Sequence, residues 1–470
     1  MEISRRSLLT RAALASAALA STGLALLPAS GLAAKPPRVL TATRGRQALL
    51  EETGPKAALW CYDGSAPGPL LRVSQGEQLA VRLDNGLEQP TTIHWHGIRN
   101  DNAMDGVVHM TQPVVQPGGS FDYRFTPPDA GTFWYHPHTG QSWEQLARGL
   151  YGLLIVDEPD PPDVDRDLIF QADDWRLTEA GQLDLASLGN RHDFFHAGRL
   201  GNVLTVNGKP YERYPLRAGE RIRLRMISTA NARVLRFRLP GDRAWLMALD
   251  GQPVPPEAET GDIVLAPGQR ADVILDVTQE PGSETAIQEV TNQPLDCASL
   301  LTTREAALAL RPPPPPLPGN PLAPLGAERR QVDLVMEGGA MRFLEDATYK
   351  GRLFSGRELA LEHGQFWAFN GIAGMAAEPL LRAALGETWT VRMVNKTAWP
   401  HVMHLHGHHM REIARSDGPP QSQAWRDSVL MQPDSELTVA FVADNPGKWM
   451  LHCHMLEHQA AGMQTWIEVG

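Results

Sequence analysis

The chain has 470 residues, of which 42% are hydrophobic and 21% are charged, so it is long enough for several globular domains. Its 54 acidic residues outnumber its 43 basic residues and give a formal net charge of -11, which argues against a nucleic-acid-binding surface. Three cysteines are too few for a disulfide framework, so packed cores must stabilise the fold.

The first 33 residues are typical of a bacterial export signal. Ser4-Arg5-Arg6 precedes an apolar, alanine-rich run from Ala12 to Leu27. Paired arginines before such a run indicate the twin-arginine export machinery, so residues 1–33 are predicted to be removed in the periplasm. A transmembrane anchor is the alternative, but the run is shorter than the roughly 20 apolar residues of a span. We expect no membrane span in the mature form.

The rest of the chain is rich in short runs of alternating apolar and polar residues. Residues 78–83 and 388–393 are examples, and clusters of Gly, Pro, Asn and Asp separate such runs. This pattern predicts antiparallel β-sandwiches, whereas long amphipathic helices are scarce. The prolines at 312–316 predict an extended linker, and a softer boundary lies at 157–162.

An internal repeat indicates three homologous sandwiches. A Gly-Glu pair opens an alternating strand at Gly76, Gly219 and Gly386. We therefore expect domains at residues 34–158, 163–305 and 329–470, with 306–328 as the proline-rich linker.

Both outer repeats contain two His-x-His motifs at matching offsets from a glycine. The first motif comprises His94 and His96, or His404 and His406, and the middle repeat has Phe237 and Leu239 there. The second motif comprises His136 and His138, or His452 and His454. Because successive side chains of a strand point to opposite faces, each motif places both imidazoles on one face. Four such pairs could converge on one metal cluster.

Cys453 lies between two of these histidines and is expected to point to the opposite face. His401 has an odd offset from His404 and could join it there, and His458 follows His454 by one helical turn. Met463 lies five residues further on. A thiolate, two imidazoles and a thioether are the ligands of a blue copper site. A single His-x-His motif is more often an ordinary strand or an incidental zinc site, but four motifs set by a repeat make coincidence negligible.

The segments His94-Trp95-His96-Gly97, His136-Pro137-His138, 401–406 and 452–463 resemble the four signatures of multicopper oxidases. The similarity covers essentially the whole mature chain. It implies an all-β fold of three cupredoxin-like Greek-key β-sandwich domains, as in laccases and bacterial cuprous oxidases. It also implies four copper ions, with a three-copper cluster between the first and last domains.

The resemblance also implies which residues bind each ion. The type 1 copper would be held by His401, Cys453, His458 and Met463. The type 2 copper would be held by His94 and His404. The type 3 pair would use His96, His136 and His454 on one ion and His138, His406 and His452 on the other.

The activity implied is one-electron oxidation of a reductant, coupled to reduction of dioxygen to water. Cys453 would pass the electrons from the type 1 copper to its neighbouring histidines. The reductant would be either a phenolic compound or a cuprous or other metal ion, two alternatives that the sequence leaves open, and a monomer is expected. A copper-free periplasmic scaffold, related to the cell-division member of the family, is the alternative. Every ligand position is filled, which argues against it. A two-domain nitrite reductase is disfavoured by the third domain.

Proton supply is where the chain departs from some relatives. Several bacterial members carry an acid directly after the last type 1 histidine, and this position is Gln459 here. Asp105, nine residues after His96, matches the acid that the family places near the cluster, although an Asp-Gly turn is the plain structural alternative. Cys61 and Cys297 are expected to be buried thiols, with a bridge left open.

Overall fold

A computed structural model describes residues 36–241, 243–258, 261–420 and 424–470. The predicted signal at residues 1–33, including Arg5 and Arg6, lies outside the described residues. Within the described ranges, none of the helices has both the length and the apolar character needed to span a membrane.

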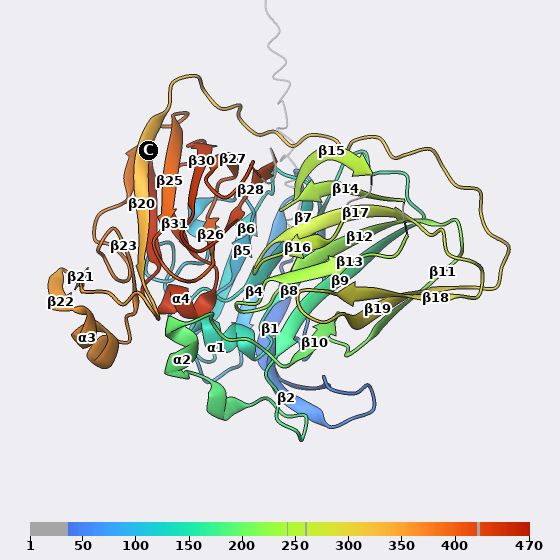
Figure 1. Cartoon of the computed structure of the whole chain (residues 1–470), viewed down its shortest axis with the longest axis horizontal. Coiled ribbons are helices and arrows are strands. Elements are labelled where there is room, and N and C mark those ends of the chain that lie inside the picture. Colours follow the sequence, from blue (N-terminus) through green and yellow to red (C-terminus); the bar gives the residue numbers. More distant parts are fainter. Residues whose placement is uncertain (1–35, 242, 259–260, 421–423) are drawn as a thin grey trace, which may run out of the picture. The chain divides into compact units, whose positions relative to one another are not determined.

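Strands dominate the chain and fall into three consecutive groups, coloured blue to cyan, green to olive and orange to red in Figure 1. The first group forms two four-stranded sheets, in the order β2-β1-β4-β6 and β3-β8-β7-β5. Their bounds are β1 (Arg38–Ala48), β2 (Lys56–Tyr62), β3 (Leu71–Ser74), β4 (Leu79–Asn85), β5 (His94–His96), β6 (Ser120–Phe125), β7 (Gly131–His136) and β8 (Gly152–Asp157). Side chains of both sheets, such as Val81 and Leu154, share one core.

The second group forms sheets in the order β10-β9-β12-β17-β14-β15 and β11-β19-β18-β13-β16. The six-stranded sheet contains β9 (Arg166–Trp175), β10 (Val203–Val206), β12 (Arg221–Ser228), β14 (Ala244–Leu249), β15 (Gln252–Ala258) and β17 (Arg270–Asp276). The five-stranded sheet contains β11 (Glu212–Leu216), β13 (Leu235–Arg238), β16 (Ile263–Leu265), β18 (Glu284–Glu289) and β19 (Leu295–Thr302). Leu224 and Ile287 meet in their common core.

The third group forms sheets in the order β23-β20-β25-β30-β27-β28 and β24-β32-β31-β26-β29. The first contains β20 (Arg330–Gly338), β23 (Trp367–Phe369), β25 (Thr388–Asn395), β27 (Met410–Arg415), β28 (Trp425–Arg426) and β30 (Glu436–Val442). The second contains β24 (Leu381–Ala383), β26 (His401–Leu405), β29 (Ser428–Met431), β31 (Gly447–Cys453) and β32 (Gln464–Val469). A hairpin, β21 (Asp346–Tyr349) with β22 (Arg352–Ser355), leaves this sandwich together with α3 (Gly356–Glu358) and the π-helical turn η3 (Leu359–His363).

The repeat seen in the sequence is present in the strand pairing. β4, β12 and β25, which follow the three Gly-Glu pairs, each pair in parallel with the first strand of their group and antiparallel with a later one. The glycines before them have φ of +78°, +85° and +86°, a turn conformation that favours glycine. The chain is therefore an all-β protein of three cupredoxin-like sandwiches, as predicted.

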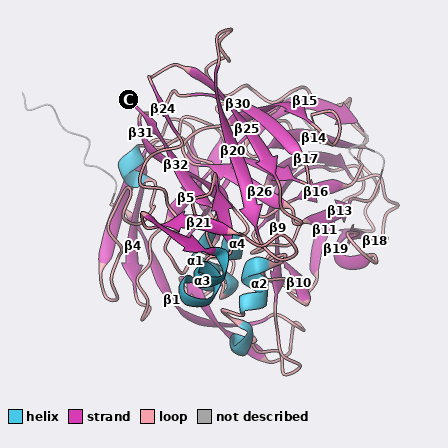
Figure 2. Ribbon diagram, turned by 60° about the vertical axis from the view of Figure 1, so that its left-hand side comes forward, coloured by secondary structure: helices cyan, strands magenta, loops and turns pink. Residues whose placement is uncertain are grey.

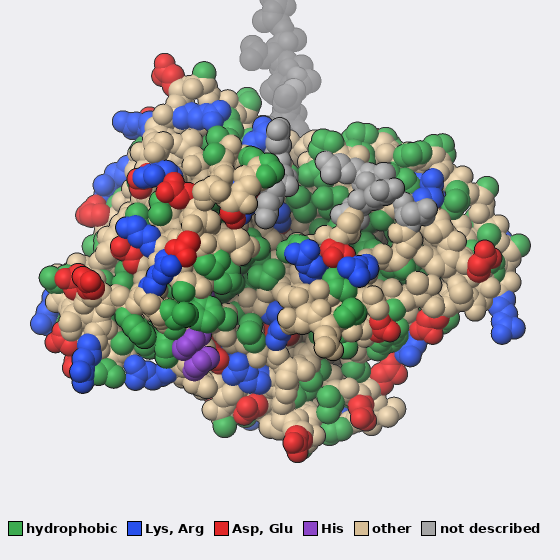
Figure 3. All heavy atoms as spheres, viewed as in Figure 1, with side chains coloured by type: hydrophobic (Ala, Val, Ile, Leu, Met, Phe, Trp, Pro, Cys, Tyr) green, Lys and Arg blue, Asp and Glu red, His purple; other side chains and the backbone are tan. Residues whose placement is uncertain are grey.

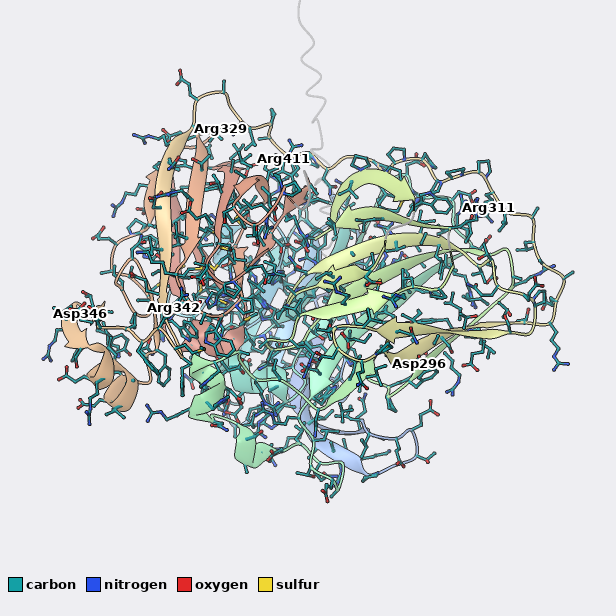
Figure 4. The ribbon with its side chains drawn as sticks, in the orientation of Figure 1. Asp296, Arg311, Arg329, Arg342, Asp346 and Arg411 are labelled. Carbon is teal, nitrogen blue, oxygen red and sulfur yellow. The ribbon has the colours of Figure 1, made fainter. Side chains whose placement is uncertain are left out.

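The segment between β19 and β20 forms no helix or strand, as its prolines predict. Figure 4 labels Arg311, which directly precedes the prolines, and Arg329, the last residue of the segment, on opposite sides of the view. Arg311 forms ion pairs with Asp163 and Asp165, which hold the segment against the second sandwich. The domain bounds set out above stay a prediction.

Each sandwich contributes one short helix to a common junction, shown in Figure 2. The helices are α1 (Ser142–Ala147), α2 (Arg191–Phe195) and α4 (Leu456–Ala460), and α4 packs against the other two. The remaining helical turns are η1 (Asn102–Met104) and η2 (Leu185–Ser187). Glu457 of α4 accepts hydrogen bonds from Asn231 and from the Arg199 backbone, and so ties α4 to the second sandwich. This junction positions His458, which α4 carries.

Candidate metal centre

The four His-x-His motifs lie on paired strands of the first and third sandwiches. β5 pairs with β7, which sets His94 opposite His136, and β26 pairs with β31, which sets His404 opposite His452. All eight histidines of the motifs are buried. The strand geometry expected from the sequence therefore brings them together.

The imidazoles of the two sandwiches meet at short range. His94 Nε2 lies 3.4 Å from His404 Nε2, and His452 Nε2 lies 3.4 Å from His138 Nε2 and 3.1 Å from His406 Nε2. Several trios have nitrogen atoms close enough to share a metal ion, among them His138, His406 and His452. The structure thus contains one eight-histidine cluster, whereas the division of these ligands among separate ions stays a prediction.

Hydrogen bonds fix which nitrogen most of these histidines present to the cluster. In five of them Nδ1 donates to an oxygen, so Nε2 carries the lone pair. Four of them donate to backbone carbonyl oxygens: His94 to Asp105, His136 to Pro137, His404 to Asp427 and His452 to Cys453. The fifth, His406, donates to Asp105 Oδ2. His96 differs, because its Nε2 hydrogen-bonds Asp427 Oδ1 at 3.0 Å. A metal bound through that nitrogen must displace Asp427.

Burial favours the neutral form, which is the form that binds metal, in seven of the eight cluster histidines: His96, His136, His138, His404, His406, His452 and His454. It lowers the pKa of His404 and His454 well below the usual value, and the pKa of His452 to about 4. Within the described part of the chain, His136 Nε2 and both ring nitrogens of His454 are buried without a hydrogen-bond partner. Such atoms are costly to bury unless a metal binds them.

The predicted type 1 ligands form a second cluster on the other side of Cys453. Cys453 Sγ lies 3.7 Å from His401 Nδ1 and 3.8 Å from His458 Nδ1. Here the outer nitrogens are anchored instead: His401 Nε2 lies 2.8 Å from the Thr397 hydroxyl, and His458 Nε2 donates to the His196 carbonyl at 2.6 Å. His458 therefore directs its Nδ1 lone pair toward the thiol.

Met463 is fully buried in the same core as Cys453. Its carbonyl oxygen accepts a hydrogen bond from the Cys453 N–H, which ties the two segments together. Burial raises the pKa of the Cys453 thiol to about 12, so metal binding must displace a proton there. The axial role of Met463 stays a prediction.

Asp105 connects two histidines of the cluster. Its Oδ2 accepts from His406 Nδ1 at 2.9 Å, its Oδ1 lies 3.2 Å from His94 Nδ1, and its side chain is 1% exposed. Asp105 also follows η1 in a turn closed by its N–H bond to Asn102, so both of the expected roles are compatible with its position.

Asp427 was not found by sequence reasoning. It hydrogen-bonds His96, as described above, and forms a buried ion pair with Arg270 of β17, whose Nη2 lies 2.7 Å from Asp427 Oδ2. Arg270 also donates to the Thr132 carbonyl, so all three sandwiches meet here. Asp427 directly precedes Ser428, which pairs with His404 in the sheet, but the sequence does not reveal this register.

Gln459, which replaces the acid of some relatives, lines a cavity of about 670 Å³. His138, Trp143, Met450 and Trp466 also line this cavity, so it reaches the edge of the histidine cluster. Cys61 and Cys297 are both free and buried, and burial raises their pKa to about 11 and about 12. The expected buried thiols are confirmed.

Copper fits this donor set. Imidazole suits copper, a buried thiol with two imidazoles suits a blue copper site, and the unpartnered histidine nitrogens require a ligand. A sandwich fold with a mixed sulfur and nitrogen site beside an all-histidine cluster defines a copper redox protein.

Comparison with known proteins identifies the family. Three protein-family models, each described as multicopper oxidase, match residues 45–161, 168–291 and 356–470. Multicopper oxidase MmcO of Mycobacterium tuberculosis is 31% identical over 469 residues, which cover 92% of this chain and 87% of that protein. The chain belongs to the multicopper oxidase family.

Solved structures agree with this family. A multi-copper oxidase from Pseudomonas thermotolerans has a TM-score of 0.81 and 32% identity, with coverage of 93% of this chain and 99% of that chain. Lac15 from a marine microbial metagenome has a TM-score of 0.73 and 38% identity, with coverage of 92% and 100%. The protein is a copper-dependent oxidoreductase that couples oxidation of a reducing substrate to reduction of dioxygen, and the scaffold alternative is not favoured.

Proposed function

We propose that this chain binds four copper ions. One type 1 ion is held by His401, Cys453, His458 and Met463, and the cluster of eight histidines holds the type 2 ion and the type 3 pair in the division given above. The observation that carries the proposal is the position of Cys453, whose thiol faces His401 and His458 while its two chain neighbours belong to the other cluster.

Bound copper supplies the one-electron chemistry, and the residues of the chain determine where electrons and protons move. Cys453 is covalently joined to His452 and His454, so it provides a short path between the two clusters. The carbonyl and carboxylate acceptors fix the tautomer and the orientation of the imidazoles. Asp105 is the acid placed to hold a proton at the cluster, because its carboxylate contacts both His94 and His406.

The test is copper content together with the stoichiometry of dioxygen reduction. A copper-loaded preparation should hold four copper ions per chain and consume one dioxygen for every four electrons, supplied by a phenol or by cuprous ion. Release of hydrogen peroxide in place of water, or a chain that holds only one copper, would contradict the proposal.

We further propose that the chain is exported by the twin-arginine pathway and acts as a periplasmic monomer of three domains, with the bounds given above. The pair Arg5-Arg6 before an apolar run supports this route. Changing both arginines to lysine should leave the enzyme in the cytoplasm, which cell fractionation measures. Undiminished periplasmic activity would indicate another export route.

A further inference from the structure

Residues 191–196, which comprise α2 and the residue after it, form a short segment of the second sandwich that lies against His458. Three consecutive carbonyl oxygens of this segment accept hydrogen bonds from the third sandwich, each at 2.6 Å. The donors are Trp367 Nε1 to Phe194, the Ala340 N–H to Phe195, and His458 Nε2 to His196. The backbone of His196 is therefore held directly against a predicted type 1 ligand.

Two histidines of this segment form a stacked pair at the surface. The ring centroids of His192 and His196 are 3.7 Å apart and their planes are within 11° of parallel. His192 is exposed and His196 is half-buried. His196 Nδ1 donates to the His192 carbonyl at 3.0 Å, so its Nε2 carries a lone pair. Neither side chain has a role in the two clusters described above.

The surroundings of the pair are largely apolar. Phe195 and Trp399 pack on His196, with centroids 4.4 Å and 5.3 Å away. Met341 is 79% exposed and directly follows Ala340, which is bonded to Phe195. Figure 3 shows histidine side chains at the surface within a largely hydrophobic area, at the place of α2 in Figure 1. Figure 4 labels Arg342, the residue after Met341, on the same side of the view.

We infer that His192 and His196 bind the reducing substrate and that this substrate is a soft metal ion, cuprous ion. The inference rests on the proposed function, since it names the donor that the oxidase uses. Two imidazoles four residues apart are a common metal-binding arrangement, and imidazole and thioether, the group that exposed Met341 carries next to Ala340, are ligand types that suit a cuprous ion. His192 lies in α2 and His196 directly follows this helix, and because their rings stack, side-chain rotation can direct one nitrogen of each toward a shared ion.

A phenolic donor fits the same surface less well. A phenol hydroxyl donates a hydrogen bond that a free carboxylate could accept, and the acid of α2 is Asp193. Asp193 is buried and paired with Arg176, whose Nη1 lies 2.7 Å from Asp193 Oδ2. Asp193 is therefore committed to an internal ion pair, whereas the His192 side chain is exposed.

The proposed step transfers one electron. Each bound cuprous ion gives up one electron and leaves as cupric ion. The electron passes along the His196 backbone to its carbonyl and crosses the hydrogen bond to His458. Four such electrons and four protons convert one dioxygen into two waters, so the reaction balances with dioxygen as the oxidant.

The experiment uses silver ion, a redox-inert stand-in for cuprous ion, with the oxidised, copper-loaded protein. Calorimetry should find one silver ion bound per chain. His192→Ala and the double variant His192→Ala, His196→Gln should lose at least about tenfold in silver affinity, because nitrogen donors are removed. His109→Asn, which removes another exposed histidine, serves as the control and should keep wild-type affinity. Blue absorption and copper content report that each variant is folded.

Two outcomes overturn the inference: wild type binds no silver ion, or the His192 variants bind it as tightly as wild type. The same wild-type preparation is assayed for dioxygen uptake with a phenol. Dioxygen uptake without silver binding refutes the substrate site alone. Silver binding without dioxygen uptake from any donor refutes the proposed function. A steady-state measurement adds a second readout: His192→Ala should raise KM for cuprous ion by more than it lowers kcat.

Discussion

Removing copper and lowering the pH from 7 to 5.5 should strongly destabilise the fold. Burial lowers the pKa of nine of the ten predicted ligand histidines below the ordinary value of 6.5. They are His96, His136, His138, His401, His404, His406, His452, His454 and His458. In the unfolded chain these side chains take up protons near pH 6.5, but in the folded, copper-free protein they stay neutral.

The sign and size follow from proton linkage. The unfolded state binds more protons, so stability falls as the pH drops through 6.5 and continues to fall toward the folded pKa, about 4 for His452 and His458. Between pH 7 and 5.5, each such histidine costs about 1.2 kcal/mol of unfolding free energy. Nine together cost about 11 kcal/mol, as much as the whole stability of a typical domain. This is an upper bound, because local opening lets some histidines protonate without global unfolding.

Urea unfolding followed by tryptophan fluorescence measures the effect at both pH values. The midpoint of the copper-free protein should fall sharply at pH 5.5. The copper-loaded protein is the matched control, and its midpoint should fall much less because bound nitrogens take up no proton. Equal midpoints for the copper-free protein at pH 7 and 5.5 would refute the reasoning, since they would mean that these histidines are accessible to water in the folded state.

Three substitutions test individual residues. Cys453→Ser should abolish the blue absorption and turnover together, because only a thiolate gives that absorption; a blue variant would remove Cys453 from the site. Asp105→Asn should keep its copper and its blue colour but lower turnover on the order of a hundredfold, because the relay acid is lost; unchanged reoxidation by dioxygen would leave Asp105 a turn residue. Met463→Leu should raise the type 1 potential in a redox titration, and a fall would exclude an axial thioether.

The sequence was sufficient to predict the features that repeat. Alternation of residue types predicted strands such as β4 and β25, and strand parity predicted that His401 and Cys453 meet. These features depend on local spacing, because the spacing of two residues on a strand decides whether their side chains point to the same face of the sheet. The repeat also showed which histidines of the first and third sandwiches correspond, although it gave no information on how the two sandwiches pack.

The contacts that could not be predicted join residues far apart in the chain. Asp427 reaches His96 and Arg270, and the His196 carbonyl reaches His458, through packing between sandwiches. No periodicity encodes which surface loop covers a given side chain. For the same reason the sequence did not reveal that α1, α2 and α4 meet at one junction.

The segment over His458 belongs to the sandwich that contains none of the ten predicted ligand histidines. With the substrate site proposed above, side-chain mutations in this segment would change which donors bind and leave the copper ligands themselves unaltered. Conversely, the exposed side chains of α2 include no predicted copper ligand, so copper binding does not require these side chains. The proposed arrangement thus assigns choice of the electron donor and reduction of dioxygen to different sandwiches of one chain.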